Sequence, residues 1–219
     1  MIVVLGEETA ENDPAGLLCA GLCAVGETAV VGLLASTADA VTEVLADAEN
    51  RSGPVTAVVL VSAGSATGHG DLADLQPEQW RQRVERPLQR TMACFQATHR
   101  RLRADGGSLV LLLPSLALVG AAGLVPWATV AEGQRSLAKA AARAWGAEGI
   151  RVNAVAVPAG LLAPSADGRD RPGQPPAALG DTPDLEGQVA GVVVSLLSRP
   201  WAGVTGATIA VDGGVWMTP

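Results

Sequence analysis

The sequence predicts an α/β fold in which a doubly wound parallel sheet of six or seven strands is covered by helices on both faces. Short apolar runs alternate with segments of helical periodicity along the chain, which is the order that parallel strands and crossover helices produce. The predicted strands are apolar at nearly every position, as expected for strands buried on both faces. The length of 219 residues suits one domain, and no linker or internal repeat divides it.

The predicted strands are all short apolar runs. In chain order they lie at residues 2–5, 28–34, 55–61, 109–113, 151–157 and 208–211. The third, fourth and fifth are the most uniformly apolar, so we expect them at the centre of the sheet. The uncharged run 108–130 is long enough to cross a membrane. Prolines and glycines interrupt it, however, so we interpret it as a strand, a loop and the start of a helix.

The predicted helices are segments with apolar residues at helical spacing. They lie at residues 15–25, 37–50, 77–104, 127–147 and 185–197. Gly53 and Pro54 end the second of these helices, and Pro77 stands in the first turn of the third, where proline is favoured. Residues 161–182 are rich in Pro, Gly, Asp and Arg, which predicts an irregular surface loop.

Composition and charge exclude several classes of function. The net charge of −7 and the pI of 4.8 argue against binding to nucleic acid or to an anionic membrane surface, because both require a basic face. The three cysteines and two histidines form no metal-binding spacing, so we predict no metal site. A small, odd number of cysteines suits a reducing cytoplasm. The first residues carry no basic segment, so no signal peptide is expected.

Three stretches of the chain resemble motifs of the short-chain dehydrogenase/reductase family. Residues 59–64 (VLVSAG) resemble a strand that ends in Asn-Asn-Ala-Gly, and residues 149–155 (GIRVNAV) resemble the GIRVN strand. Residues 204–214 (VTGATIAVDGG) resemble the C-terminal TG…DGG segment. The resemblance implies one Rossmann-like domain over residues 1–219, shorter than is usual because a strand–helix unit is missing between Gly32 and Thr37.

The resemblance also implies a catalytic site whose chemistry is absent from this chain. Active members use a tyrosine as general acid/base, a lysine that lowers its pKa, a serine that polarises the carbonyl and an asparagine in a proton relay. Counting back from Asn153 places the tyrosine, lysine and serine at Trp127, Ala131 and Pro114. Counting on from Trp80, which resembles a tryptophan that recurs in the family, places the asparagine at Pro87. The chain has no tyrosine at all, and its only lysine is Lys139. An indole N–H is only a donor and cannot cycle protons, so we predict no catalytic residues of the family's type.

The segment that would bind a cofactor departs from the family pattern as well. The family's glycine-rich loop lets pyrophosphate approach a helix N-terminus. Here the corresponding residues 7–13 carry four carboxylates, at Glu7, Glu8, Glu11 and Asp13. Like charges oppose the binding of pyrophosphate. The position of the aspartate on the adenine side has become Ala35, so we predict that no nicotinamide cofactor binds.

Two principal functions remain open from the sequence. In the first, the chain is a cytoplasmic, non-catalytic subunit (a pseudoenzyme) that pairs with an active family member as a hetero-dimer or hetero-tetramer; a homo-oligomer is also possible. In the second, the fold hosts a non-redox reaction of the aldol, dehydration or cyclisation type. Ser115, His69 and Glu132 are the residues that such a reaction could use. A ligand-binding or regulatory domain is a third, weaker alternative.

The C-terminal segment, residues 185–219, is predicted to form the subunit interface. Its helix is apolar on more than one face, which is typical of a helix covered on most sides. Two tryptophans, Trp201 and Trp216, lie on either side of its strand, and tryptophan is favoured at interface hot spots. The predicted interface residues are Val192, Val193, Leu196, Trp201, Thr208, Ile209, Val211 and Trp216.

Overall fold

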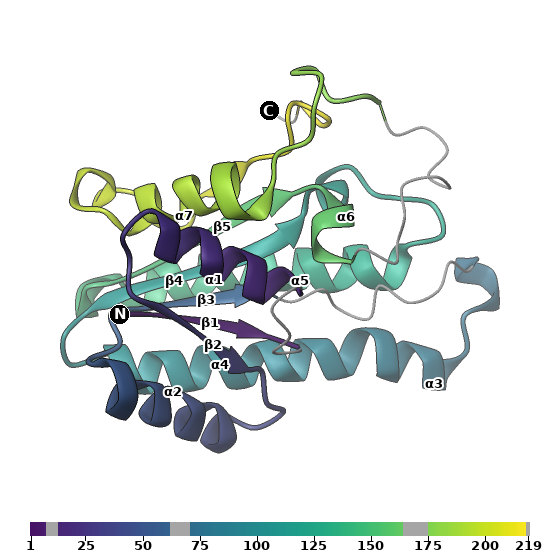
Figure 1. Cartoon of the computed structure of the whole chain (residues 1–219). Coiled ribbons are helices and arrows are strands. Elements are labelled where there is room, and N and C mark those ends of the chain that lie inside the picture. Colours follow the sequence, from purple (N-terminus) through teal and green to yellow (C-terminus); the bar gives the residue numbers. More distant parts are fainter. Residues whose placement is uncertain (8–12, 62–70, 164–174, 218–219) are drawn as a thin grey trace.

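The computed structural model describes residues 1–7, 13–61, 71–163 and 175–217, and these form a parallel sheet with helices on both faces (Figure 1). The sheet has six strands in the order β2-β1-β3-β4-β5-β6. Their bounds are β1 Ile2–Gly6, β2 Ala29–Leu33, β3 Ala57–Val61, β4 Gly107–Pro114, β5 Ile150–Val157 and β6 Thr208–Ala210. From β1 the chain winds outward in both directions, which confirms the predicted doubly wound arrangement.

Helices cover both faces of the sheet and separate the buried residues into two cores. Their bounds are α1 Pro14–Ala24, α2 Ala38–Ser52, α3 Pro77–Trp80, α4 Arg86–Leu102, α5 Val125–Trp145, α6 Ala159–Leu162 and α7 Ala190–Leu197. In Figure 1, α1 and α7 pack on one face, while α2 and α4 pack on the other. Along β3, Val59 and Val61 point into the first core, and Val58 and Leu60 point into the second.

The central strands are buried as the sequence predicts. Every residue of β3 is buried, and so is every residue of β4 after Gly107. The uncharged run 108–130 comprises most of β4, a 3₁₀ turn at Ser115–Leu118 and the start of α5. None of the helices in the described ranges is both long enough and apolar enough to cross a membrane.

The helix predicted at residues 77–104 contains a local change of winding. A π-helical turn, Arg81–Glu85, joins α3 to α4, and the Arg86 N–H bonds to the Arg81 carbonyl. Pro87 follows directly. Because proline has no N–H and its ring crowds the carbonyl four residues earlier, a wider turn before Pro87 lets the helix continue.

The loop predicted at residues 161–182 is confirmed only in part. Its first two residues, Leu161 and Leu162, belong to the short helix α6. Residues 175–182 contain no helix or strand, as predicted, and residues 164–174 lie outside the described part. Gly160 and Leu161 follow Pro158, whose carbonyl accepts a bond from the Leu161 N–H at 3.0 Å, so a tight turn extends into the predicted loop.

Three residues of the matched C-terminal motifs hold the β5–β6 edge of the sheet together. Asn153 donates from Nδ2 to the Val204 carbonyl (2.9 Å) and accepts at Oδ1 from the Ala207 N–H (3.1 Å). The Arg151 guanidinium donates to the carbonyls of Leu196 and Leu197 at the end of α7 and to that of Trp201. These bonds satisfy carbonyls that the helix terminus leaves without partners.

The last of the three, Asp212, is buried and fixes the C-terminal turn. Its Oδ1 accepts from the Gly214 N–H (3.0 Å), and its Oδ2 accepts from the Trp216 N–H (3.2 Å). Gly213 and Gly214 adopt positive φ angles of 69° and 78°. L side chains rarely adopt this conformation, so the two glycines of the motif serve the turn.

Candidate functional site

The carboxyl ends of the parallel strands form the edge at which α/β folds usually bind ligands. The structure places all four predicted positions of the catalytic relay near this edge. Pro114 is the last residue of β4, Pro87 lies on α4, and Trp127 and Ala131 lie on α5. All four are buried; Trp127 is 2% exposed and Ala131 is 1% exposed. The positions are therefore filled by packed side chains that cannot take up or release a proton near neutral pH.

Close to these positions, a short chain of hydrogen bonds links α4 to α5. Gln134 Nε2 donates to Thr91 Oγ1 (2.8 Å), and Thr91 Oγ1 donates to the carbonyl of Pro87 (3.0 Å). Gln134 is 1% exposed and Thr91 is fully buried. An amide, a hydroxyl and a peptide carbonyl do not titrate near neutral pH, so this network can position helices but cannot relay protons. Both residues lie one helical turn beyond a relay position, but no pattern in the sequence marks them as partners.

The residues named for a non-redox reaction are not brought together in the described part of the chain. Ser115 begins the 3₁₀ turn after β4 and is 2% exposed. Glu132 forms an ion pair with Arg135 on the same helix, with 2.9 Å between Arg135 Nε and Glu132 Oε1. This bond to Glu132 raises the pKa of Arg135 above its usual value. Among the described residues no hydrogen bond joins Ser115 to Glu132, and His69 lies outside them.

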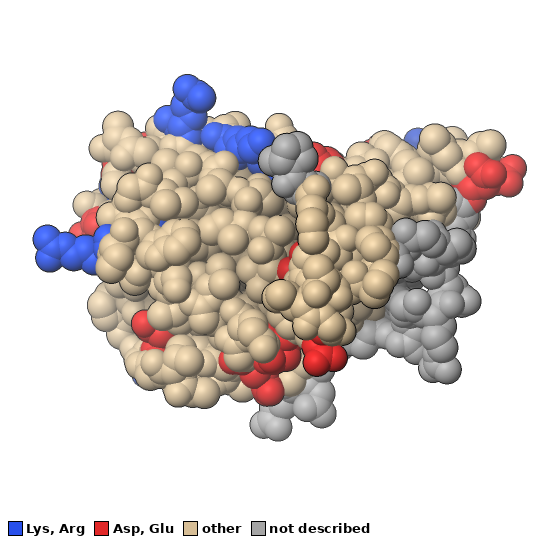
Figure 2. Space-filling view, turned by 90° about the horizontal axis from the view of Figure 1, so that it is seen from above, with Lys and Arg blue, Asp and Glu red and all other residues tan. Residues whose placement is uncertain are grey.

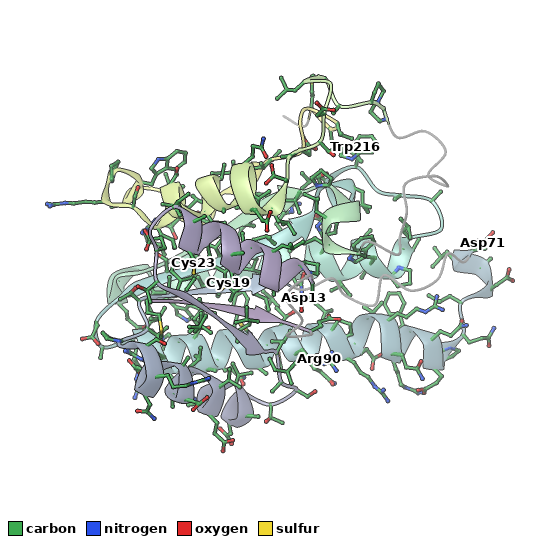
Figure 3. The ribbon with its side chains drawn as sticks, viewed as in Figure 1. Asp13, Cys19, Cys23, Asp71, Arg90 and Trp216 are labelled. Atoms are coloured by element: carbon green, nitrogen blue, oxygen red, sulfur yellow. The ribbon has the colours of Figure 1, made fainter. Side chains whose placement is uncertain are left out.

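The N-terminus of α1 occupies the place where the family's cofactor loop would present its N–H groups. Asp13 is the N-cap, and its Oδ1 accepts from the Gly16 N–H at 2.7 Å (Figure 3). Pro14 follows as the first helical residue and has no N–H to offer. A carboxylate already satisfies this terminus and adds a negative charge where pyrophosphate would lie. Within the described residues, Asp13 and Pro14 therefore do not fit a nicotinamide dinucleotide, while Glu8 and Glu11 of the predicted acidic segment lie outside the described part.

The adenosine side of the family's cofactor position also lacks its recognition group in this chain. Ala35 lies between β2 and α2, and Thr37 caps α2 by accepting from the Ala40 N–H (3.3 Å). Asp39, in the first turn of α2, forms an ion pair with Arg100 on α4 at 2.8 Å. The methyl group of Ala35 cannot bind a ribose hydroxyl, and the neighbouring Asp39 is engaged by Arg100.

The predicted interface residues divide into three groups by burial. The prediction is wrong for Val193 and Leu196, which are 0% exposed and belong to the core beneath α7. Trp201 is 37% exposed. The remaining five are half-buried: Val192, Thr208, Ile209, Val211 and Trp216. Their contact with a partner stays a prediction.

The face that carries α7 and the C-terminal turn is covered mostly by uncharged residues and carries few basic ones. In Figure 2, which looks onto this side of the molecule, the Lys and Arg side chains stand near the margins, whereas several Asp and Glu side chains lie within the face. Met217 on the C-terminal turn is 81% exposed.

Comparisons with known proteins agree on the class of protein that this chain resembles. A family model described as enoyl-(acyl carrier protein) reductase matches residues 18–216. The L-rhamnose 1-dehydrogenase (NAD(P)(+)) of Azotobacter vinelandii is 31% identical over 230 residues, which cover 98% of this chain and 87% of the relative. Short-chain reductase protein NovJ of Streptomyces niveus is 29% identical over 228 residues, covering 98% and 84%.

A solved structure supports the fold in the same way. The 3-ketoacyl-(acyl-carrier-protein) reductase of Brucella melitensis, solved in complex with NADH, superposes with a TM-score of 0.80. The superposition covers 98% of this chain and 97% of the reductase at 15% sequence identity. At this identity the likeness shows the shared architecture alone.

Proposed function

The chain belongs to the short-chain dehydrogenase/reductase family, and we propose that within this family it is a non-catalytic subunit that pairs with and supports an active oxidoreductase. One observation carries the proposal: proline, proline, tryptophan and alanine occupy the four relay positions and are buried there. Because no tyrosine exists anywhere in the chain, a shifted alignment cannot restore the relay.

The cofactor segment supports the same proposal. A reductase subunit must hold its own hydride donor, and the Asp13 carboxylate with Pro14 opposes a dinucleotide at the N-terminus of α1. The relatives named above are a dehydrogenase and reductases, so an active member of the same family is the counterpart that would supply both cofactor and acid/base groups.

The surface that would meet this partner is the β6–α7 side of the molecule. β6 stands at the edge of the sheet, where backbone groups are open to pairing. Trp201 and the C-terminal turn with Trp216 and Met217 add partly exposed apolar groups beside it. Members of one family can pair through equivalent surfaces about a two-fold axis. A pseudo-two-fold pair with an active relative would use this side of both chains.

The non-redox alternative has less support. A general base must be within reach of the group that it activates. Glu132 is held by Arg135, and no hydrogen bond joins it to Ser115 in the described ranges. We therefore do not propose a second function.

Co-expression with an intact relative encoded beside this chain tests the proposal. We expect a stable mixed oligomer by light scattering and reduction of a carbonyl substrate by that oligomer. Replacing the partner's tyrosine with phenylalanine should abolish turnover, whereas Trp127→Phe in this chain should leave turnover unchanged. Turnover of NADH or NADPH by the purified chain alone would contradict the proposal. It would also be contradicted if the chain stayed monomeric and bound none of the intact relatives with which it was co-expressed.

A further inference from the structure

A hollow lies at the edge of the sheet where the strands begin, opposite the relay positions. It is a pocket of 360 Å³ under the C-terminal end of α7, lined by residues at the amino ends of β1, β3, β4 and β5. In Figure 1 this edge lies beside the N-terminus, away from the carboxyl ends of the strands. The pocket is therefore separate from the degenerate relay and cofactor positions.

The pocket exists because small side chains line up across the sheet. Ile2, Ala57, Ser108 and Arg151 are register partners on four neighbouring strands, so their side chains point to the same face. Alanine and serine in the middle of this row leave space that valine or leucine fills elsewhere in the core. Val194 and Leu197 on α7 close the space from above. Ile2, Ala57, Val194 and Leu197 thus give the pocket a set of apolar side chains among its polar groups, against which a short hydrocarbon chain can pack.

A buried hydroxyl faces this space. Ser108 is 6% exposed and lines the pocket. Its backbone N–H bonds to the Thr56 carbonyl, but among the described residues its Oγ has no hydrogen-bond partner. This hydroxyl is open to the pocket rather than enclosed by protein, so it is available to donate to a polar group bound there.

Opposite charges stand at the two ends of the pocket and do not pair. Arg151 lies at the β5 end, where its guanidinium contacts three backbone carbonyls and forms no ion pair with any described carboxylate. Burial lowers the pKa of Arg151 below its usual value, so a nearby anion would be stabilising. Glu27 lies at the β1 end, where the Ile2 N–H bonds to the adjoining Thr28 carbonyl. Glu27 is exposed and has no ion pair among the described residues.

The width of the sheet explains why these two groups stay apart. β1 and β5 are separated by β3 and β4, which makes three strand spacings, or about 14 Å between backbones. A singly charged anion would be attracted by Arg151 but repelled by Glu27. A singly charged cation would be attracted by Glu27 but repelled by Arg151. A molecule with both charges and an apolar middle would satisfy both ends.

The geometry points to a binding site for a small zwitterion with a short hydrocarbon middle, such as an ω-amino acid. Its carboxylate lies at the free N–H groups of Arg151, its ammonium group meets Glu27, and the Ser108 hydroxyl donates to the carboxylate. The methylene groups pack against Ala57 and Leu197. This site is independent of the subunit pairing proposed above.

Titration of the full chain with 6-aminohexanoate tests the site, with hexanoate and hexylammonium as singly charged probes. Backbone amide resonances followed by NMR report both affinity and location. We expect 6-aminohexanoate to bind about tenfold more tightly than either singly charged probe, with shifts concentrated at Glu27, Ser108 and Arg151. Equal affinities for the three probes, or shifts centred elsewhere, would overturn the inference.

Two variants sharpen the test. Glu27→Gln should reduce the affinity for 6-aminohexanoate about tenfold and leave the affinity for hexanoate equal or higher, because one repulsive charge is gone. Glu43→Gln removes an exposed carboxylate on α2, outside the pocket, and should change neither value. Ser108→Val fills the pocket and should abolish binding. If the Ser108→Val variant does not fold, the Glu27→Gln variant still tests the proposal. An unchanged affinity of Glu27→Gln for 6-aminohexanoate would reject the proposed site.

Discussion

Two regions of this molecule differ in how far they match the family: one retains the family's motif residues, and the other has lost them. At the β5–β6 edge, Asn153 and Asp212 match the residue types of the family motifs, and both form hydrogen bonds to the backbone. On the facing sides of α4 and α5, the relay positions have become Pro87, Trp127 and Ala131. The residues at the edge bond to backbone and therefore maintain the fold, whereas the relay positions matter only for chemistry. Loss of the second set with retention of the first is what a subunit selected for assembly would show.

The largest expected effect concerns the retained region. Asn153→Leu leaves the Val204 carbonyl and the Ala207 N–H without their buried partner. We expect the free energy of unfolding to fall by about 3 kcal/mol, measured by urea denaturation. Trp127→Phe is the control and should cost about 1 kcal/mol, because it keeps an aromatic ring in place. A smaller loss for Asn153→Leu than for the control would show that the matched motif is not what holds this edge.

The next effect concerns the hydrogen bonds between α4 and α5. Thr91→Val keeps the shape of the side chain but removes the hydroxyl that accepts from Gln134 and donates to Pro87. We expect a loss of about 1–2 kcal/mol in the free energy of unfolding. In a mixed oligomer, turnover per active partner should stay unchanged. A fall in turnover with unchanged stability would instead assign these residues a part in the chemistry.

The sequence predicted the strands well, for a physical reason. Strands buried on both faces must be apolar throughout, so β3, β4 and β5 are visible without a structure. The π-helical turn before Pro87 was not predictable in the same way, because a proline inside a helical pattern can equally end, kink or widen the helix. The hydrogen bond between Gln134 and Thr91 depends on how α4 and α5 pack against each other. The order of residues in one sequence does not give the packing of two helices.

The interface prediction shows a second limit of sequence patterns. The helix α7 is apolar on most sides, which indicates burial without saying what buries it. Val193 and Leu196 turn out to face the protein's own sheet, whereas Val192 is half-buried. The relay positions were assigned by counting from the matched motifs, and that assignment stays a prediction. The pocket at the amino edge could not be located from the sequence, because it depends on register between strands far apart in the chain.

A smaller effect is expected at the N-terminus of α1. Calorimetry with NAD(H) and NADP(H) at millimolar concentration should detect no useful binding to this chain alone. Asp13→Ser removes the charge but keeps a side chain that can accept from the Gly16 N–H, so stability should change by less than about 0.5 kcal/mol. The cofactor should still fail to bind, because Pro14 has no N–H and Ala35 offers no partner for ribose. Low-micromolar affinity in the original chain would show that the cofactor region has been misjudged.

The smallest expected effect is on activity in a chain rebuilt at the relay. Trp127→Tyr combined with Ala131→Lys restores the acid/base pair by sequence, but Pro114 and Pro87 still lack the carbonyl donor and the relay asparagine. Groups that act as a unit are strongly non-additive, so two of four restored groups should give no measurable turnover with NADPH and a carbonyl substrate. The introduced side chains must also fit at buried positions, because Trp127 is 2% exposed and Ala131 is 1% exposed. The new lysine would be buried one helical turn before Gln134, whose bond to Thr91 joins two neutral groups. Burial of an unpaired ammonium lowers its pKa and removes the charge that should activate the tyrosine. A folded double variant that consumes cofactor would show that the loss of function is confined to these two side chains, and that the cofactor segment is intact.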